Sequence, residues 1–176
     1  SAEPPDVAIS PDGTTIAFVA RDAGGLRRIW LRPLDALVPQ AVPGTDGART
    51  PFWSPDGGNL AFFADGKLRR IARAGGTPET LADAPDSRGG AWGRGDVIVF
   101  APTSGGPLLR IAASGGAASP ATRLDETRGE TGHRFPSFLP DGRRFLYGVV
   151  PGSDQGVRIR LGTLEGQPRV GSDVVL

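Results

Sequence analysis

The apolar residues of this chain gather in short, nearly continuous runs that are separated by turn residues. Four such runs are TIAFVA at 15–20, LAFFA at 60–64, VIVFA at 97–101 and RFLYGVV at 144–150. Runs of this length, bounded by glycine, proline and aspartate, are typical of β-strands that are covered on both faces. No segment shows the 3.6-residue apolar period of an amphipathic helix, so the pattern predicts an all-β chain.

One short phrase recurs just before each apolar run. It reads SPDG at 10–13 and 54–57 and LPDG at 139–142, and the third run follows GRGD at 93–96. Aligned on Asp12, Asp56, Gly95 and Asp141, the copies stand 44, 39 and 46 residues apart. An Arg-Ile pair at 28–29, 70–71, 110–111 and 158–159 keeps the same register. Two phrases that stay in step four times indicate four structural repeats.

The recurring phrase has the composition of a tight turn. Proline presets φ near −65°, aspartate hydrogen-bonds its own backbone, and glycine accepts a positive φ. We therefore predict a hairpin turn between the first two strands of each repeat, and in the third repeat the aspartate and glycine are transposed. The predicted turn residues are Pro11, Asp12, Gly13, Pro55, Asp56, Gly57, Pro140, Asp141 and Gly142. An apolar residue precedes each turn: Ile9, Trp53, Trp92 and Phe138.

The repeat length defines the architecture that we expect. About 44 residues hold four short antiparallel strands, which is one blade of a β-propeller. The predicted fold is all-β and β-propeller-type, with four four-stranded antiparallel blades in an open arc, a partial propeller or a small ring. We expect one domain over 1–176, with blades at about 1–50, 51–90, 91–136 and 137–176. Trp53 and Phe62 are expected in the core.

The turn phrase followed by IAF resembles the PD40, or TolB-like, class of WD40-like propeller repeats. Longer phrases, such as PFWSPDGGNLAFFADGKLRRI at 51–71 and RGETGHRFPSFLPDGRRFLY at 128–147, resemble the propeller region of bacterial eukaryotic-like serine/threonine kinases. This resemblance implies an extracytoplasmic location and a sensing or docking role. The kinase signatures HRD and DFG and a kinase-type glycine-rich loop are absent, so kinase activity is not carried over. Such propellers commonly have six or more blades, which is more than the four repeats here.

Composition narrows the classes of function. Lys and Arg number 20 against 19 Asp and Glu, so a net charge of +1 argues against nucleic acid as the partner. With no cysteine, disulfides and thiolate sites are excluded. No apolar run reaches the roughly 20 residues of a membrane-spanning helix, so we expect no direct membrane span. The absence of methionine favours a processed chain or one piece of a longer protein.

Catalytic and metal-binding constellations are weak. A Ser-His-Asp triad would have to use His133, the only histidine, and no G-x-S-x-G motif is present. Asp125, Glu126 and Glu130 lie near His133, but their spacing matches no metal loop, so we interpret them as solvated charges. The sequence therefore predicts no enzyme activity, no cofactor and no metal.

The function that we expect is a non-enzymatic protein-binding or scaffolding module. One version is an extrinsic subunit of a larger bacterial envelope or membrane complex, of respiratory or photosynthetic type, in the periplasm or otherwise outside the cytoplasm. The alternative is the ligand-sensing propeller of a receptor serine/threonine kinase, which binds a small sugar or peptide. Docking predicts an exposed apolar patch flanked by arginine, whereas sensing predicts a polar pocket.

Four residues are the candidate contacts with a partner. Arg49, Arg88, His133 and Arg134 are expected in loops that precede the first strands of blades two, three and four. Loops of a rigid scaffold commonly carry the binding residues. For His133 a second interpretation is an imidazole in the loop that hydrogen-bonds a neighbouring carbonyl.

Overall fold

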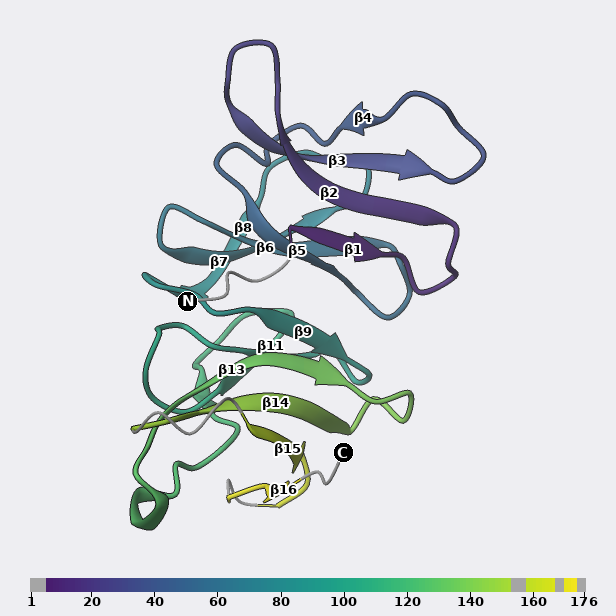
Figure 1. The fold of residues 1–176 in the computed structure, drawn as a ribbon. Helices are drawn as coiled ribbons and strands as arrows, with labels where there is room; N and C mark the ends of the chain where they lie inside the picture. Colours follow the sequence, from purple (N-terminus) through teal and green to yellow (C-terminus); the bar gives the residue numbers. More distant parts are fainter. Residues whose placement is uncertain (1–5, 153–157, 167–169, 174–176) are drawn as a thin grey trace. The chain divides into compact units, whose positions relative to one another are not determined.

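Four four-stranded antiparallel sheets make up the computed structural model, which describes residues 6–152, 158–166 and 170–173 (Figure 1). The strands of each sheet are neighbours in chain order, which confirms the all-β, propeller-type prediction. The sheets comprise β1 (Val7–Ile9), β2 (Thr15–Arg21), β3 (Arg27–Pro33) and β4 (Gln40–Ala41); β5 (Arg49–Trp53), β6 (Asn59–Ala64), β7 (Lys67–Ala72) and β8 (Glu79–Asp83); β9 (Gly90–Gly93), β10 (Val97–Phe100), β11 (Leu109–Ala112) and β12 (Ser119–Pro120); and β13 (Glu130–Phe138), β14 (Arg144–Pro151), β15 (Arg158–Thr163) and β16 (Ser172–Asp173).

The chain divides into two compact units, Ser1–Asp83 and Ala84–Leu176, and each holds two of the sheets. The single domain that we expected over 1–176 stays a prediction. The fourth sheet begins at Glu130, ahead of the boundary expected at 136/137, because the turn phrase marks the end of the first strand and β13 has nine residues. Among the described residues, none forms a helix with the length and apolar character that crossing a bilayer requires.

Each SPDG phrase forms the predicted turn between the first two strands of its sheet. The Ser10 hydroxyl accepts a hydrogen bond from the Thr15 amide at 2.9 Å and donates one to Asp12 Oδ1 at 2.5 Å. Ser54 makes the same pair of contacts, with the Asn59 amide at 2.8 Å and Asp56 Oδ1 at 2.6 Å. The serine thus satisfies one backbone donor and orients the aspartate, which explains why the phrase recurs.

The LPDG turn lacks this serine, and arginine replaces its hydrogen bonds. Asp141 accepts the backbone amides of Arg143 and Arg144 at 2.9 Å and the Arg144 Nε at 2.5 Å. Gly142 has φ 68°, and a Cβ there would lie 2.4 Å from Arg94 Cγ. Glycine is therefore required at this turn both for its backbone conformation and for space.

The turn of the third sheet is built differently from the other three. Residues 54–59 lie between the paired Trp53 and Leu60, whereas residues 93–97, one fewer, lie between the paired Trp92 and Ile98. Gly95 and Asp96 both have positive φ, at 76° and 57°. The transposed phrase is thus a shorter turn, in which aspartate, a residue that tolerates the left-handed region, takes a second such position.

Acid is expected to destabilise the fold in part through these turns. Hydrogen bonds from the Ser10 hydroxyl and from Thr14 lower the pKa of Asp12 from 3.8 to about 2, and backbone amides lower the pKa of Asp141 to about 2. Because the folded pKa is below the unfolded value, the stabilisation is complete above pH 3.8 and is lost as the pH falls towards 2. Melting temperatures measured by circular dichroism across this range should fall less steeply for the double variant Asp12→Asn, Asp141→Asn.

The matched control is Asp35→Asn, which removes one exposed carboxylate outside the turns. Its melting temperature should follow the pH profile of the unchanged protein. A double turn variant that keeps the full pH dependence would contradict the account.

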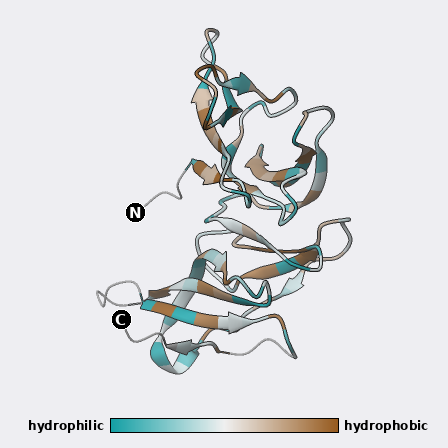
Figure 2. Ribbon diagram, turned by 90° about the vertical axis from the view of Figure 1, so that its right-hand side faces the viewer, coloured by the Kyte–Doolittle hydropathy of each residue, from teal (hydrophilic) through white to brown (hydrophobic). Residues whose placement is uncertain are grey.

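Each unit has an apolar core between its two sheets. In the first unit, Ala17 and Ile29 of one sheet pack with Trp53, Leu60 and Phe62 of the other. In the second unit, the buried side chains that share a core are Val99, Ala101, Leu108, Ala121, Phe145, Tyr147 and Val149. Figure 2 shows the hydrophobic colouring concentrated on strands. The positions predicted for Trp53 and Phe62 are confirmed, because both are buried in this core.

Candidate functional site

Three of the candidate residues occupy equivalent positions in their sheets. Arg49, Arg88 and Arg134 each stand seven residues before the aligned turn position, at Asp56, Gly95 and Asp141 respectively. The residue that follows each arginine has a positive φ: Thr50 at 47°, Gly89 at 91° and Phe135 at 53°. A positive φ thus follows an arginine in or just before the first strand of three sheets.

In two of the three sheets this feature is a β-bulge. The pairing of β5 with β6 shifts between Arg49 and Phe52, and that of β13 with β14 shifts between Arg134 and Ser137. A positive φ is strained for a β-branched or aromatic residue and persists only where the surroundings impose it. β-Bulges change the direction in which neighbouring side chains point, and they are frequent next to functional sites.

The predicted loop location is wrong for three of the four candidates. Arg49 is exposed but lies in β5, and His133 and Arg134 lie in β13; only Arg88 lies in a loop, just before β9. The reason is that the leading strands begin earlier than the turn phrase indicates. The binding role of these residues stays a prediction.

His133 is 1% exposed. Its Nδ1 lies 2.8 Å from Thr122 Oγ1, and its Nε2 lies 3.3 Å from Glu130 Oε2. The expected hydrogen bond to a neighbouring carbonyl is therefore wrong, because both partners are side chains. Burial lowers the pKa of His133, which favours the neutral imidazole.

The hydrogen bonds define the tautomer of His133. The Thr122 hydroxyl accepts the Leu108 amide at 2.9 Å, so its own proton is available to Nδ1. The proton of His133 then resides on Nε2 and is donated to the Glu130 carboxylate. In the first unit Ala48 takes the place of His133, and Thr45 accepts the Ile29 amide in the same way but donates to the Val42 carbonyl.

Glu130 belongs to a buried ionic cluster, so its interpretation as a solvated charge is wrong. Its Oε1 lies 2.7 Å from Arg160 Nη2, and both side chains are 1% exposed. The Tyr147 ring centroid lies 4.7 Å from that of His133, and burial raises the pKa of Tyr147. Glu130 is close to His133 in the sequence, so their proximity could be expected. Nothing in the sequence indicated that Arg160, which lies in β15, joins them. Asp125 instead begins the 3-10 turn η1 (Glu126–Arg128), where it accepts the Thr127 amide.

The cluster joins elements within the second unit and has no opening for a substrate at His133. Within the ranges that the structure describes, no three His, Asp or Glu side chains converge as ligands of a metal would. The buried charges are paired with one another, and His133 lies between Thr122 and Glu130, which is how buried charged and polar side chains are normally accommodated. The arrangement therefore acts as a structural link between β13, β14 and β15.

An exposed apolar loop lies in the first unit, between β3 and β4. Leu34, Leu37 and Val38 are 57%, 90% and 74% exposed. Arg32, at the end of β3, is exposed and donates from Nε to the Ala36 carbonyl at 3.2 Å. The other repeats have glycine-bearing turns at 74–76, 114–116 and 164–166 in this position. This apolar loop is therefore particular to the first repeat.

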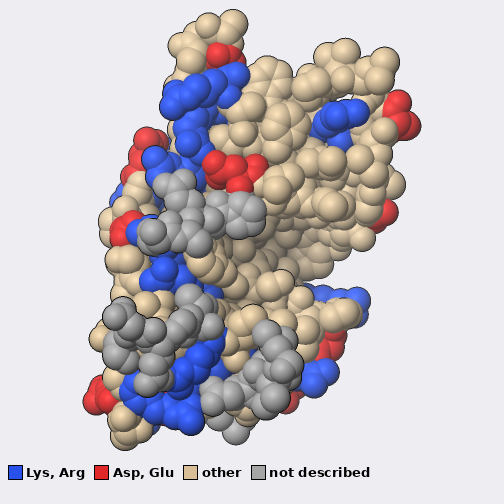
Figure 3. All heavy atoms as spheres, viewed as in Figure 1, with Lys and Arg blue, Asp and Glu red and all other residues tan. Residues whose placement is uncertain are grey.

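Several half-buried cations on the strands have acidic partners nearby. Figure 3 shows Lys and Arg atoms gathered along one side of its face, with Asp and Glu atoms among them. Arg28 Nε lies 2.7 Å from Asp46 Oδ1, and Arg70 Nη2 lies 2.7 Å from Glu79 Oε2. Their charge is thereby offset rather than presented as a basic surface.

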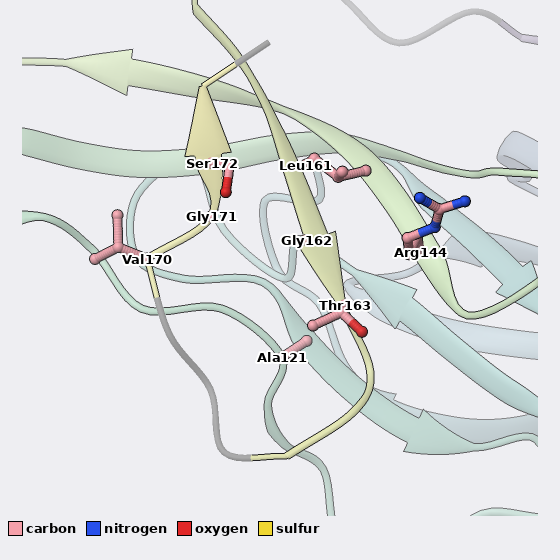
Figure 4. A pocket seen from close by; sticks show the side chains of 8 residues that line it. All are labelled: Ala121, Arg144, Leu161, Gly162, Thr163, Val170, Gly171 and Ser172. Atoms are coloured by element: carbon pink, nitrogen blue, oxygen red, sulfur yellow. The ribbon is translucent and has the colours of Figure 1, made fainter.

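A pocket of about 230 Å³ lies beside β15 and β16 (Figure 4). Small and apolar residues line much of it, including Ala121, Gly162 and Val170, together with Arg144. Arg144 is already paired with Asp141. Sites for small molecules are usually larger, roughly 300–1,000 Å³, with several convergent polar groups.

Comparison with known proteins supports the fold. No protein-family model matches the sequence, and no curated protein sequence matches it. Among solved structures, a putative TolB from Agrobacterium tumefaciens is 20% identical, with a TM-score of 0.78 over 96% of this chain and 63% of that one. TolB from Acinetobacter baumannii is 17% identical, with a TM-score of 0.74 over 97% of this chain and 44% of that one.

The same fold occurs in proteins of different function. The β-propeller domain of Cps50 (Swd1) from Myceliophteria thermophila is 13% identical, with a TM-score of 0.69 over 99% of this chain and 57% of that one. Similar structures also include an oligogalacturonate lyase. The chain thus spans 63% and 44% of the two TolB chains that it resembles. It has a β-propeller-type fold of the kind found in TolB and WD40-like proteins, and the resemblance to kinase propellers stays a prediction.

Proposed function

We propose that this chain is a non-enzymatic protein-binding module whose apolar loop docks onto a partner protein. The observation that carries the proposal is the exposure of Leu34, Leu37 and Val38 beside Arg32. Contiguous exposed apolar side chains mark protein interfaces, whose centres are apolar and in which arginine is enriched. This is the combination that a docking function predicts.

The finer proposal is an extrinsic subunit of a larger bacterial envelope or membrane complex, located in the periplasm or otherwise outside the cytoplasm. The similarity of the fold to TolB supports an extracytoplasmic setting, and the apolar loop supports attachment to other subunits. The ligand-sensing alternative requires a polar, convergent pocket, and the pocket beside β15 offers less support for it than the apolar loop offers for docking.

The test is the mass of the protein in a gentle extract of its source envelope. We expect size-exclusion chromatography with light scattering to place the unchanged chain in a species well above its own 18.3 kDa, together with partner subunits identified by mass spectrometry. The variant Leu37→Asp, Val38→Asp should elute at the mass of the free chain, because two carboxylates in an apolar interface carry a desolvation penalty.

The control is Val170→Asp, which introduces one carboxylate at another exposed valine, in the second unit. This variant should remain in the large species. A monomeric unchanged chain, or an apolar-loop variant that stays in the complex, would contradict docking through the loop.

A further inference from the structure

Arg88 and Arg134 are neighbours in the second unit. The Phe135 amide donates to the Arg88 carbonyl at 2.8 Å, which ties the strand that carries Arg134 to the loop that carries Arg88. A Cβ at Gly89 would lie 3.3 Å from Phe135 Cα, so the two positive-φ residues pack against one another. The repeated backbone feature thus brings two arginines of different sheets together.

A carboxylate is paired with only one of the two guanidinium groups, that of Arg88. Arg88 Nη1 lies 2.6 Å from Asp86 Oδ1, whereas the hydrogen bond that Arg134 makes through Nη2, to the Ser104 carbonyl, is long at 3.5 Å. The Arg134 Nε is buried and has no hydrogen-bond partner. Burial, and secondly the charge of Arg88, lowers the pKa of Arg134. One positive charge and one buried donor therefore remain unsatisfied.

We propose that Arg88 and Arg134 form a binding site for a single carboxylate group presented by the docked partner. A carboxylate accepts paired N–H donors from arginine and would supply the negative charge that Arg134 lacks. Asp86 offsets the charge of one arginine, so the charge that remains at the site matches that of a single carboxylate. This inference rests on the proposed docking function, since it names the chemistry of the partner.

Arg49 is the equivalent residue of the first unit and makes no ion pair with any described residue. It has the same position relative to its bulge, but the amide of the residue that follows it donates to the Asp6 side chain of the first sheet and not to the carbonyl of an arginine. Asp6 pairs with Arg27 and accepts the Thr50 amide at 2.8 Å. Two neighbouring arginines at this position are therefore described in the second unit alone.

The site can be tested without the partner. The probes are the acetylated, amidated tripeptide Gly-Glu-Gly, the acetylated tripeptide Gly-Gly-Gly with a free carboxyl terminus, and Gly-Gln-Gly with both ends blocked. They are titrated into the whole chain at constant ionic strength while the NMR shifts of the arginine Nε–H groups are followed. We expect the Arg134 signal to shift saturably with at least one of the two carboxylate peptides and not with Gly-Gln-Gly. The stronger ligand then identifies a side-chain or a terminal carboxylate as the source.

Substitutions distinguish a binding role from a structural one. Arg134→Gln should weaken binding of the stronger peptide about tenfold or more, followed on the Arg88 signal, because a charge-assisted hydrogen bond is lost. Arg134→Lys should bind with intermediate affinity, because it keeps the charge without the paired donors. Asp86→Asn should strengthen binding severalfold, because it removes a competing negative charge. The matched control Arg123→Gln, at an exposed arginine elsewhere in this unit, should leave the affinity unchanged.

Several outcomes would overturn the proposal. They are the absence of a saturable shift with both carboxylate peptides, an equal response to Gly-Gln-Gly, unchanged affinity in both Arg134 variants, or tighter binding of inorganic phosphate than of either peptide. The failure of this proposal can be distinguished from the failure of the proposed docking function. If the peptides bind but the apolar-loop variant stays in its complex, the carboxylate site is supported and docking through the apolar loop is rejected.

Discussion

Replacing Trp53 with alanine is expected to lower the free energy of unfolding by about 3–5 kcal/mol, the cost of a lost core aromatic. Trp53 is 6% exposed and packs in the core that the first two sheets share. Its Nε1 donates to the Ala8 carbonyl at 3.3 Å, and the Arg73 guanidinium lies 5.5 Å from the ring centroid. Arg73 in turn donates to Thr15 Oγ1 at 2.9 Å, so the substitution loosens contacts between two sheets.

Urea unfolding followed by circular dichroism measures this loss. The matched control is Trp30→Ala, because Trp30 is only half-buried and lies outside the core cluster. Its indole also donates to a backbone carbonyl, that of Ala20 at 3.3 Å, so the two variants lose the same kind of hydrogen bond. The control should lose clearly less stability. Equal losses for both tryptophans would contradict the assignment of Trp53 to the core.

The second large effect is expected for Arg160→Met. This variant removes the cation that lies 2.7 Å from the buried Glu130 and leaves a carboxylate in a site from which water is excluded. Breaking a buried ion pair from one side costs about 3–5 kcal/mol, because the remaining charge is uncompensated. The measurement is again urea unfolding at neutral pH, and adding Glu130→Gln to Arg160→Met should recover part of the loss.

A surface pair of the same residue types provides the control. Arg143 Nη1 lies 3.3 Å from Glu165 Oε1, with both side chains about 70% exposed. Because water screens this pair, Arg143→Met should cost only about 0–1 kcal/mol. If the Arg160 and Arg143 variants lose similar stability, or if Glu130→Gln gives no recovery, the buried pair does not hold the second unit together as described.

Much of the fold depends on interactions between residues that are close in the chain and can therefore be predicted from the sequence. The SPDG phrase recurs because serine, aspartate and glycine each meet a requirement of one turn, through the hydroxyl of Ser10, the carboxylate of Asp12 and the positive φ of Gly13. The apolar runs between the turns are long enough for one strand each. Interactions among residues that are close in the chain leave a regular pattern, and such patterns are the strongest signals in a single sequence.

The candidate site was predictable only in part. The positions of Arg49, Arg88 and Arg134 follow from the repeat, but the placement of Arg49 and Arg134 in strands does not, because their β-bulges depend on pairing with the next strand. The exposure of Leu37 was not predicted from its residue type, since leucine is usually buried; the only signal was the missing glycine turn in the first repeat.

By itself, the sequence determined the number of repeats, the all-β class and the hairpin turns, because these depend on contacts within a few residues. Only the tertiary structure decided that His133 is buried and meets Thr122, that Glu130 pairs with Arg160, and that Arg88 and Arg134 are neighbours. The physical reason is that these contacts join different strands and loops, so their partners depend on how the strands pair within a sheet and how one sheet packs on the next. The spacing of residues along the chain does not encode such packing. The effect of a charged or buried group can be interpreted only when its three-dimensional neighbours are known.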